Sequence, residues 1–295
     1  MKRKQFVLSI LLIFMTLFCL VGCAQRLELE EKEVIADVEI KRIVLDEVTM
    51  PLEIYEDPNI ENPKVSYYTH DKYKLDVSVI YASNTLKLER KFERTTFTPT
   101  FTFDLKCKTI IYLPTNYSGE LDLETTTGSM KIEGISSGEI KIDVTTGAIS
   151  LNNVDVDGEV DICTTTGAVK VESLNAKELS IDSTTGDISV LNSTIEGRIE
   201  TDLTSGKTSL ENVKAESIKA EATTGLINLQ SVEISVLIDA NATTGDINIS
   251  VLGKKEEYTT KLSSATGSTT GATEGGSKKI TCETTVGKIK VEYLG

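Results

Sequence analysis

Acidic side chains recur at one position of a sequence repeat, and regularly spaced carboxylates could catalyse hydrolysis or bind a metal ion. Four residues before a recurring glycine, six of eight repeats carry an acid: Glu124, Asp143, Asp182, Asp202, Glu221 and Glu283. Paired carboxylates serve the acid–base hydrolysis of polysaccharides, and oxygen ligands of this kind also suit calcium. A regular column is, however, typical of a solvated strand face, whereas catalytic sites usually break a local rule. We therefore expect neither a catalytic site nor a metal site, with a polysaccharide-acting enzyme as the alternative.

A second reactive group is the thiol of Cys23. The chain opens with the basic residues Lys2 to Lys4 and continues with an apolar run from Phe6 to Leu20. This is the pattern of a secretory signal, and the run is shorter than the roughly 20 residues that span a membrane. It ends in Leu20-Val21-Gly22-Cys23, which resembles the bacterial lipobox, whose cysteine receives a diacylglycerol. We expect residues 1–22 to be a lipoprotein signal peptide and Cys23 to carry the lipid.

The charge of the chain narrows the classes of partner. The formal net charge is −14 at pH 7. Residues 1–22 carry three positive charges and no negative ones, so the mature chain would carry −17. Such a surface repels nucleic acid and anionic lipid headgroups, and we expect no nucleic-acid partner. We expect a protein held by its lipid at the extracytoplasmic face of the cell membrane, with an unidentified protein or glycan ligand and no cofactor.

A repeated Thr-Thr-Gly-like motif predicts the strands and corners that carry these acidic side chains. Eight aligned copies end in the glycines Gly128, Gly147, Gly167, Gly186, Gly206, Gly225, Gly245 and Gly287. The spacing between the first seven alternates between 19 and 20 residues, and a degenerate ninth copy ends at Gly267. Glycine can adopt a corner conformation that strains other residues. Threonine stands two residues before the glycine in all eight copies, so stacked coils would form a threonine ladder.

Apolar residues hold fixed positions around each glycine. Seven residues before it and four residues after it stand aliphatic side chains in all eight copies, beginning with Leu121 and Ile132. Alternation with a period of two indicates strands with one buried face, and dipeptides such as Ser137-Gly138 indicate a second corner. The sequence therefore predicts an all-β fold, a single parallel β-helix (β-solenoid) with about 20 residues per coil. The crossover preference of parallel strands favours right-handed winding.

Parts of the chain do not follow the repeat. We interpret the charged residues 23–37 as a tether, with a short helix over Arg26–Glu33 as an alternative. Residues 38–113 keep β character without the period, and we expect an irregular N-terminal β cap or first coils, with a separate small β domain as the alternative. Residues 114–295 would form the regular repeats. Within them, the Ser-, Thr- and Gly-rich stretch 253–279 predicts a flexible insertion.

The lipid signal, the irregular β segment leading into Tyr112-Leu113-Pro114 and the Thr-Thr-Gly coils together resemble a bacterial family. That family of domains of unknown function is catalogued as "putative adhesin", and the resemblance covers roughly residues 40–295. It implies a β-helical envelope or secreted protein, some relatives of which belong to envelope-stress systems, and it brings no catalytic signature. We therefore expect a lipid-anchored envelope module for surface binding, adhesion or scaffolding, linked to envelope stress, that is not an enzyme.

Overall fold

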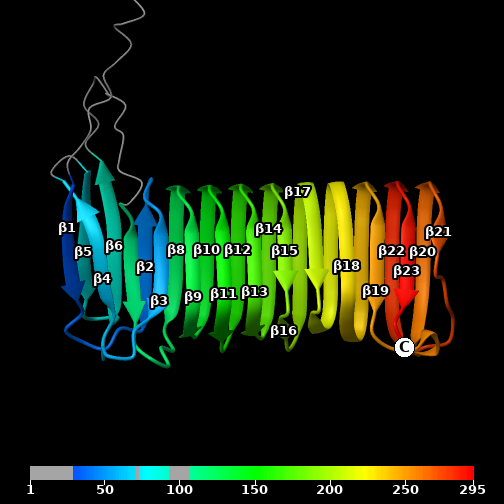
Figure 1. Cartoon of the computed structure of the whole chain (residues 1–295), viewed down its shortest axis with the longest axis horizontal. Helices are drawn as coiled ribbons and strands as arrows, with labels where there is room; N and C mark the ends of the chain where they lie inside the picture. The colour runs from blue at the N-terminus through cyan, green and yellow to red at the C-terminus, as the bar shows by residue number, and fades with distance from the viewer. Residues whose placement is uncertain (1–28, 71–72, 93–106) are drawn as a thin grey trace, which may run out of the picture.

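The computed structural model describes residues 29–70, 73–92 and 107–295. These residues wind into a rod-shaped parallel β-solenoid (Figure 1). A strand residue pairs with the residue 19 or 20 positions later, as Leu121 pairs with Ile140 and Ile140 with Val160. The predicted all-β fold and coil length are thereby confirmed. The predicted signal peptide and Cys23 lie outside the described residues.

Each regular coil contains two β segments joined by the Thr-Thr-Gly corner. The strands of these coils are β8 (Glu120–Thr127), β9 (Met130–Ser137), β10 (Glu139–Thr146), β11 (Ile149–Val156), β12 (Glu159–Thr166), β13 (Val169–Ala176), β14 (Glu178–Thr185), β15 (Ile188–Leu191), β16 (Thr194–Ile195), β17 (Arg198–Glu211), β18 (Lys214–Thr244) and β19 (Ile247–Val251). Both predicted aliphatic columns are buried, with side chains no more than 3% exposed from Leu121 to Val291. Burying these columns between coils supplies the main stabilising term of the rod.

The corner glycines lie directly above one another. A Cβ atom added to Gly147 would stand 1.9 Å from the carbonyl oxygen of Gly128, and one added to Gly225 would stand 1.8 Å from that of Gly206. Gly147 also has φ of +156°, a backbone conformation that side chains disfavour. Glycine is required at the corner because the backbones of successive coils approach this closely.

A further bend, present in six successive coils, was not predicted. It lies six residues after the corner glycine and has a positive φ, with glycine, asparagine or serine in this column: Gly134, Asn153, Ser173, Asn192, Asn212 and Ser231. Asparagine tolerates the left-handed region better than most residues. The Asn212 amide also donates a hydrogen bond of 3.2 Å to the Asn192 side chain in the neighbouring coil. The recurring asparagines were the available sequence signal for this bend.

The N-terminal strands continue the rod and then cover its end. They are β1 (Glu30–Ile35), β2 (Arg42–Glu47), β3 (Leu52–Glu56), β4 (Lys64–Thr69), β5 (Tyr73–Ile80), β6 (Thr85–Phe92) and β7 (Thr109–Leu113). Strands β2 and β3 pair in parallel with β8 and β9, and β6 and β7 form the next layer outward. Antiparallel strands complete the end, with β5 on β6, β4 on β7 and β1 on β4.

Strand β1 corrects the expected tether. Residues 30–35 pair with β4 over six residues, from Glu30 opposite Thr69 to Ile35 opposite Lys64. Neither a tether nor a helix over Arg26–Glu33 describes this part, because the edge of β4 offers backbone partners to an extended segment. Residues 23–28 of the expected tether lie outside the described residues.

A buried ion pair joins two of these N-terminal coils. The Arg90 guanidinium donates to both carboxylate oxygens of Glu47 at 2.8 to 3.1 Å, and both side chains are 0% exposed. A further guanidinium nitrogen of Arg90 donates to the backbone oxygen of Tyr68 at 2.8 Å. Glu47 pairs with Thr125 in the strand register, so the ion pair occupies a core position. Breaking one partner of such a pair costs about 3–5 kcal/mol, and this penalises a slip in strand register.

The C-terminal end corrects the expected flexible insertion at 253–279. These residues contain the 3-10 turn η1 (Lys255–Glu257) and the strands β20 (Tyr258–Thr266) and β21 (Thr269–Thr270), which form the outermost coil. The following strands, β22 (Lys278–Val286) and β23 (Ile289–Tyr293), return to lie between that coil and β18–β19. The stretch lacks aliphatic columns because a terminal coil has a neighbour on only one side. The described residues include no apolar helix of the length that a bilayer span requires.

The glycine stack predicts a selective effect of an added methyl group. Gly147→Ala should destabilise the rod by about 3 kcal/mol or more, because the methyl group meets the Gly128 carbonyl and the residue keeps an unfavourable φ. Gly134→Ala is the matched control: its φ is +63°, but nothing lies within 4 Å of the added Cβ, so about 1 kcal/mol is expected. Thermal and denaturant unfolding of the two variants measures the difference. Equal losses would contradict the close-approach explanation.

Candidate functional site

The acidic column predicted from the repeat forms one line along the outer face of the rod. The register places Glu124 beside Asp143, Asp182 beside Asp202, and Asp202 beside Glu221. These side chains alternate along their strands with buried residues, so the carboxylates face solvent. Cys163 and Asn241 hold the same position in the two copies without an acid.

The structure extends this column beyond the eight predicted copies. Asp46 of β2 pairs with Glu124, and Glu89 of β6 pairs with Asp46. At the other end, Ser263 of β20 pairs with Glu283. Sequence reasoning missed Asp46 and Glu89 because no Thr-Thr-Gly motif follows them. The alternation of Ile43 and Leu45 before Asp46 was the remaining signal.

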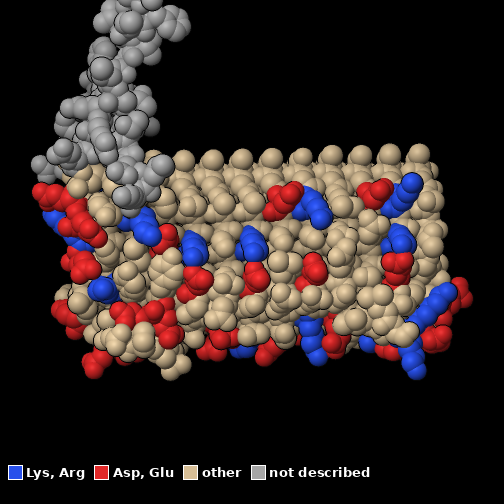
Figure 2. Space-filling model, in the orientation of Figure 1, with Lys and Arg blue, Asp and Glu red and all other residues tan. Residues whose placement is uncertain are grey.

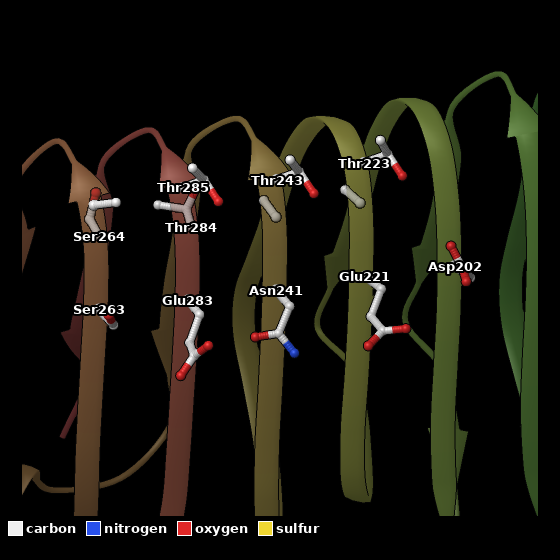
Figure 3. A pocket seen from close by; sticks show the side chains of 13 residues that line it. Asp202, Glu221, Thr223, Asn241, Thr243, Ser263, Ser264, Glu283, Thr284 and Thr285 are labelled. Carbon is white, nitrogen blue, oxygen red and sulfur yellow. The ribbon is translucent and has the colours of Figure 1, made fainter.

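A groove runs between the acidic column and the exposed threonine ladder. One stretch of about 590 Å³ lies over the small side chains Ala222 and Ala242. Figure 3 shows its two rows, with Asp202, Glu221, Asn241, Glu283 and Ser263 in one and Thr223, Thr243 and Thr285 in the other. A second stretch of about 370 Å³ shares Asp202 and continues over Asp182, Cys163 and Asp143. The two stretches follow the same columns, so we name them together the acidic groove.

The carboxylates of the acidic groove act on one another. Partial burial raises the pKa of the Asp182 carboxyl, and the negative charges of Asp202, Asp161 and Glu200 raise it further. Lys219 offsets part of this repulsion, since its Nζ lies 2.9 Å from a Glu200 oxygen and 3.1 Å from a Glu221 oxygen. The groove is therefore a strip of negative potential with hydroxyl groups along one side.

Cys163 and Cys282 form no disulfide bond, and Cys163 lines the acidic groove. Burial raises the pKa of Cys163, and the carboxylates of Asp161, Asp182 and Asp143 raise it further. Burial raises the pKa of Cys282 to about 12. Because the thiolate is the nucleophilic form, both thiols are poorly reactive at neutral pH.

The acids of the groove lie in a single row, with at most one from each coil. Within residues 29–70, 73–92 and 107–295, no three His, Cys, Asp or Glu side chains gather as a metal-binding group. Acid–base catalysis by two carboxylates depends on environments that separate their pKa values, whereas this file repeats one environment. The arrangement offers many equivalent hydrogen-bond acceptors to an elongated partner.

The chain matches a known family model and resembles solved structures. The family model described as "Toastrack DUF4097" matches residues 40–292. A "putative lipid binding protein" from Parabacteroides distasonis is similar in structure, with 16% identity, a TM-score of 0.55, and 90% of this chain and 99% of that chain covered. A "putative adhesin" from Bacteroides fragilis has 17% identity and a TM-score of 0.42, with 90% and 99% covered. The likeness to the lipid binding protein shows the fold alone. No curated protein matches the chain.

The pKa shift of Asp182 predicts a pH-dependent effect on stability. A raised pKa in the folded state means that the protonated carboxyl favours folding, so this stabilisation is present at low pH and is lost as the pH rises through the folded pKa. Asp182→Asn should therefore raise the unfolding temperature by about 1–2 °C at pH 7. The gain should vanish below the ordinary aspartate pKa of about 3.9.

The matched control is Asp157→Asn, at the second corner of the coil and outside the acidic groove. It should leave the unfolding temperature nearly unchanged at both pH values. A destabilised Asp182→Asn variant at pH 7 would show that the column is not under repulsion.

Proposed function

The chain belongs to the Toastrack DUF4097 family, and on this premise we propose that it is a lipid-anchored module of the cell envelope that binds a protein or glycan partner along its acidic groove. The observation that carries the proposal is the continuity of the groove. Its stretches of about 590 and 370 Å³ share Asp202 and follow one register through successive coils. A rigid file of equivalent sites suits an elongated ligand that repeats its own hydrogen-bonding groups.

The chemistry of the two rows defines what such a ligand must offer. Carboxylates accept hydrogen bonds, and they bind ammonium, guanidinium or hydroxyl donors. The threonine hydroxyls on the other side both donate and accept. A hydroxyl-rich glycan or an extended basic protein segment meets both rows. The negative potential would speed the encounter with a basic partner more than it would raise the final affinity.

The proposed location at the membrane rests on the lipid anchor. The basic start of the chain, the short apolar run and the motif ending in Cys23 support a lipoprotein signal. Strand β1 begins at Glu30, so the capped N-terminal end of the rod follows shortly after the lipidated residue. The acidic groove would then extend away from the membrane on its extracytoplasmic side, in the setting where the family resemblance places envelope-stress proteins.

Charge reversal tests the acidic groove. The double variant Asp202→Lys with Glu221→Lys places two cations at neighbouring coils of the groove. We expect at least a tenfold loss in capture of envelope protein and glycan by the immobilised mature rod. The control, Glu196→Lys with Glu216→Lys, makes the same charge change near the second corner, where the Glu216 amide donates to Gly197. Equal capture by the two variants would refute the groove as the binding surface.

Cysteine substitution tests the anchor. Cys23→Ser removes the thiol that would receive the lipid, and the protein should leave the membrane fraction for the soluble fraction, because the acyl chains supply the attachment. Cys19→Ser, inside the apolar run of the signal, is the matched control and should stay membrane-bound. Fractionation with detergent-phase separation measures both. If Cys23→Ser stays in the membrane like the control, the lipid-anchor proposal is wrong.

A further inference from the structure

The two ends of the rod are finished differently (Figure 1). Antiparallel strands β1, β4 and β5 cover the N-terminal end. At the other end, one edge of β20 pairs with β22. On the other edge the described chain supplies one antiparallel bridge, in which Thr260 and Thr273 exchange backbone hydrogen bonds of 3.0 and 3.3 Å. This edge therefore already accepts an antiparallel segment, over part of its length.

The rest of the β20 edge is open to a further strand. Backbone groups alternate in direction along a strand, so Leu262 and Ser264 direct their N–H and C=O groups to the same side as Thr260. The segment that carries Thr273 reaches this edge after Gly271, whose carbonyl accepts a 2.7 Å hydrogen bond from the Tyr293 hydroxyl. Beyond that point, no described segment pairs with Leu262 or Ser264 on this side.

The open end also leaves side chains of the core columns uncovered. Leu262, Ser264 and Thr269 pair with Cys282, Thr284 and Ile289 of the adjacent inner coil, which are 0%, 5% and 1% exposed. Leu262 and Ser264 are half-buried and Thr269 is exposed. A strand laid on this edge would cover Leu262 just as each coil covers the one below it.

The last two coils, residues 253–295, carry a charge opposite to that of the whole chain. Residues 253–295 contain seven lysines and five glutamates, although the chain carries −14. Lys261 lies on the open part of β20, is exposed, and takes part in none of the ion pairs formed by the described residues. A lysine on a strand edge deters pairing with an uncharged or basic strand, and it favours a strand that carries an acid at the facing position.

We propose that this tip is a docking site for an extended acidic peptide segment of a partner protein, which adds to β20 as an antiparallel strand from Lys261 to Ala265. Main-chain hydrogen bonds to Leu262 and Ser264 would supply affinity, and alternate side chains would supply specificity. The side chain opposite Leu262 faces the core level and is apolar, while the acid stands opposite Lys261 on the outer face. The peptide motif is therefore an alternation of acidic and apolar residues. The docking strand uses the edge of β20 that faces away from β22, whereas the acidic groove, which Ser263, Ser264 and Ala265 also line, runs across the outer face of the coils.

Titration of the ¹⁵N-labelled mature protein with a six-residue peptide of alternating glutamate and valine tests the proposal. The expected result is saturable shifts of the Leu262 and Ser264 amide signals, and much weaker shifts with the lysine–valine counterpart. Lys261→Glu should reverse this preference. Absence of shifts at millimolar acidic peptide, or a preference that Lys261→Glu leaves unchanged, would overturn it.

A pair of variants at one position separates backbone pairing from general contact. Ser264→Pro removes the outward N–H, a change that an edge strand tolerates when that group faces solvent, and it should weaken binding at least tenfold. Ser264→Ala loses the 2.9 Å hydroxyl bond to the Gly287 carbonyl and should bind as the wild type does. Equal binding by the two would refute strand addition. The variant Asp202→Lys with Glu221→Lys should bind the peptide normally, so failure of the groove proposal and failure of this one are distinguishable.

Discussion

The close stacking of coils at the glycine corner is the constraint on which the rest of this rod depends. With the Gly128 carbonyl directly beneath Gly147, there is no room for a side chain and no slack for a shift along the strand. Each regular coil from Gly128 to Gly245 must therefore return to the same place after 19 or 20 residues. That return keeps aliphatic residues above aliphatic residues, and it carries the outward acids and threonines into two parallel columns. The acidic groove is thus a by-product of the packing rule that holds the core together.

Most of the regular rod was predictable because its information is local and repeated. The glycine spacing and the columns that begin with Leu121 and Ile132 determine strand, face and register at once. The ends were harder, because their residues follow no period. Glu30–Ile35 is a charged strand that owes its conformation to the edge of β4, and the Ser- and Thr-rich β20 owes its conformation to β22. Such partners, distant in sequence, cannot be read from composition.

The candidate site was likewise predictable only in its regular part. The file of carboxylates was visible in the repeat, yet Asp46 and Glu89 joined it only through pairing with Glu124 and with each other. The depth of the groove over Ala222 and Ala242 depends on which small residues fall between the two columns. In the view of Figure 2, the upper edge of the rod carries no charged residues, and the acidic and basic side chains lie below it. The surface thus offers chemically different strips to its surroundings, each as long as the stack of coils beneath it.

The inverted order of the C-terminal coils has a consequence for how the molecule reaches its native state. Residues 278–293 lie between β18–β19 and β20–β21, although they emerge from the ribosome after both. Coils up to β19 can fold one after another as the chain is synthesised, because their order in the rod is their order in the sequence. The outermost coil cannot settle until the later residues have entered beneath it. Closure of the solenoid is therefore a late, concerted step, and a chain halted before residue 278 would hold a solenoid with an unfinished edge.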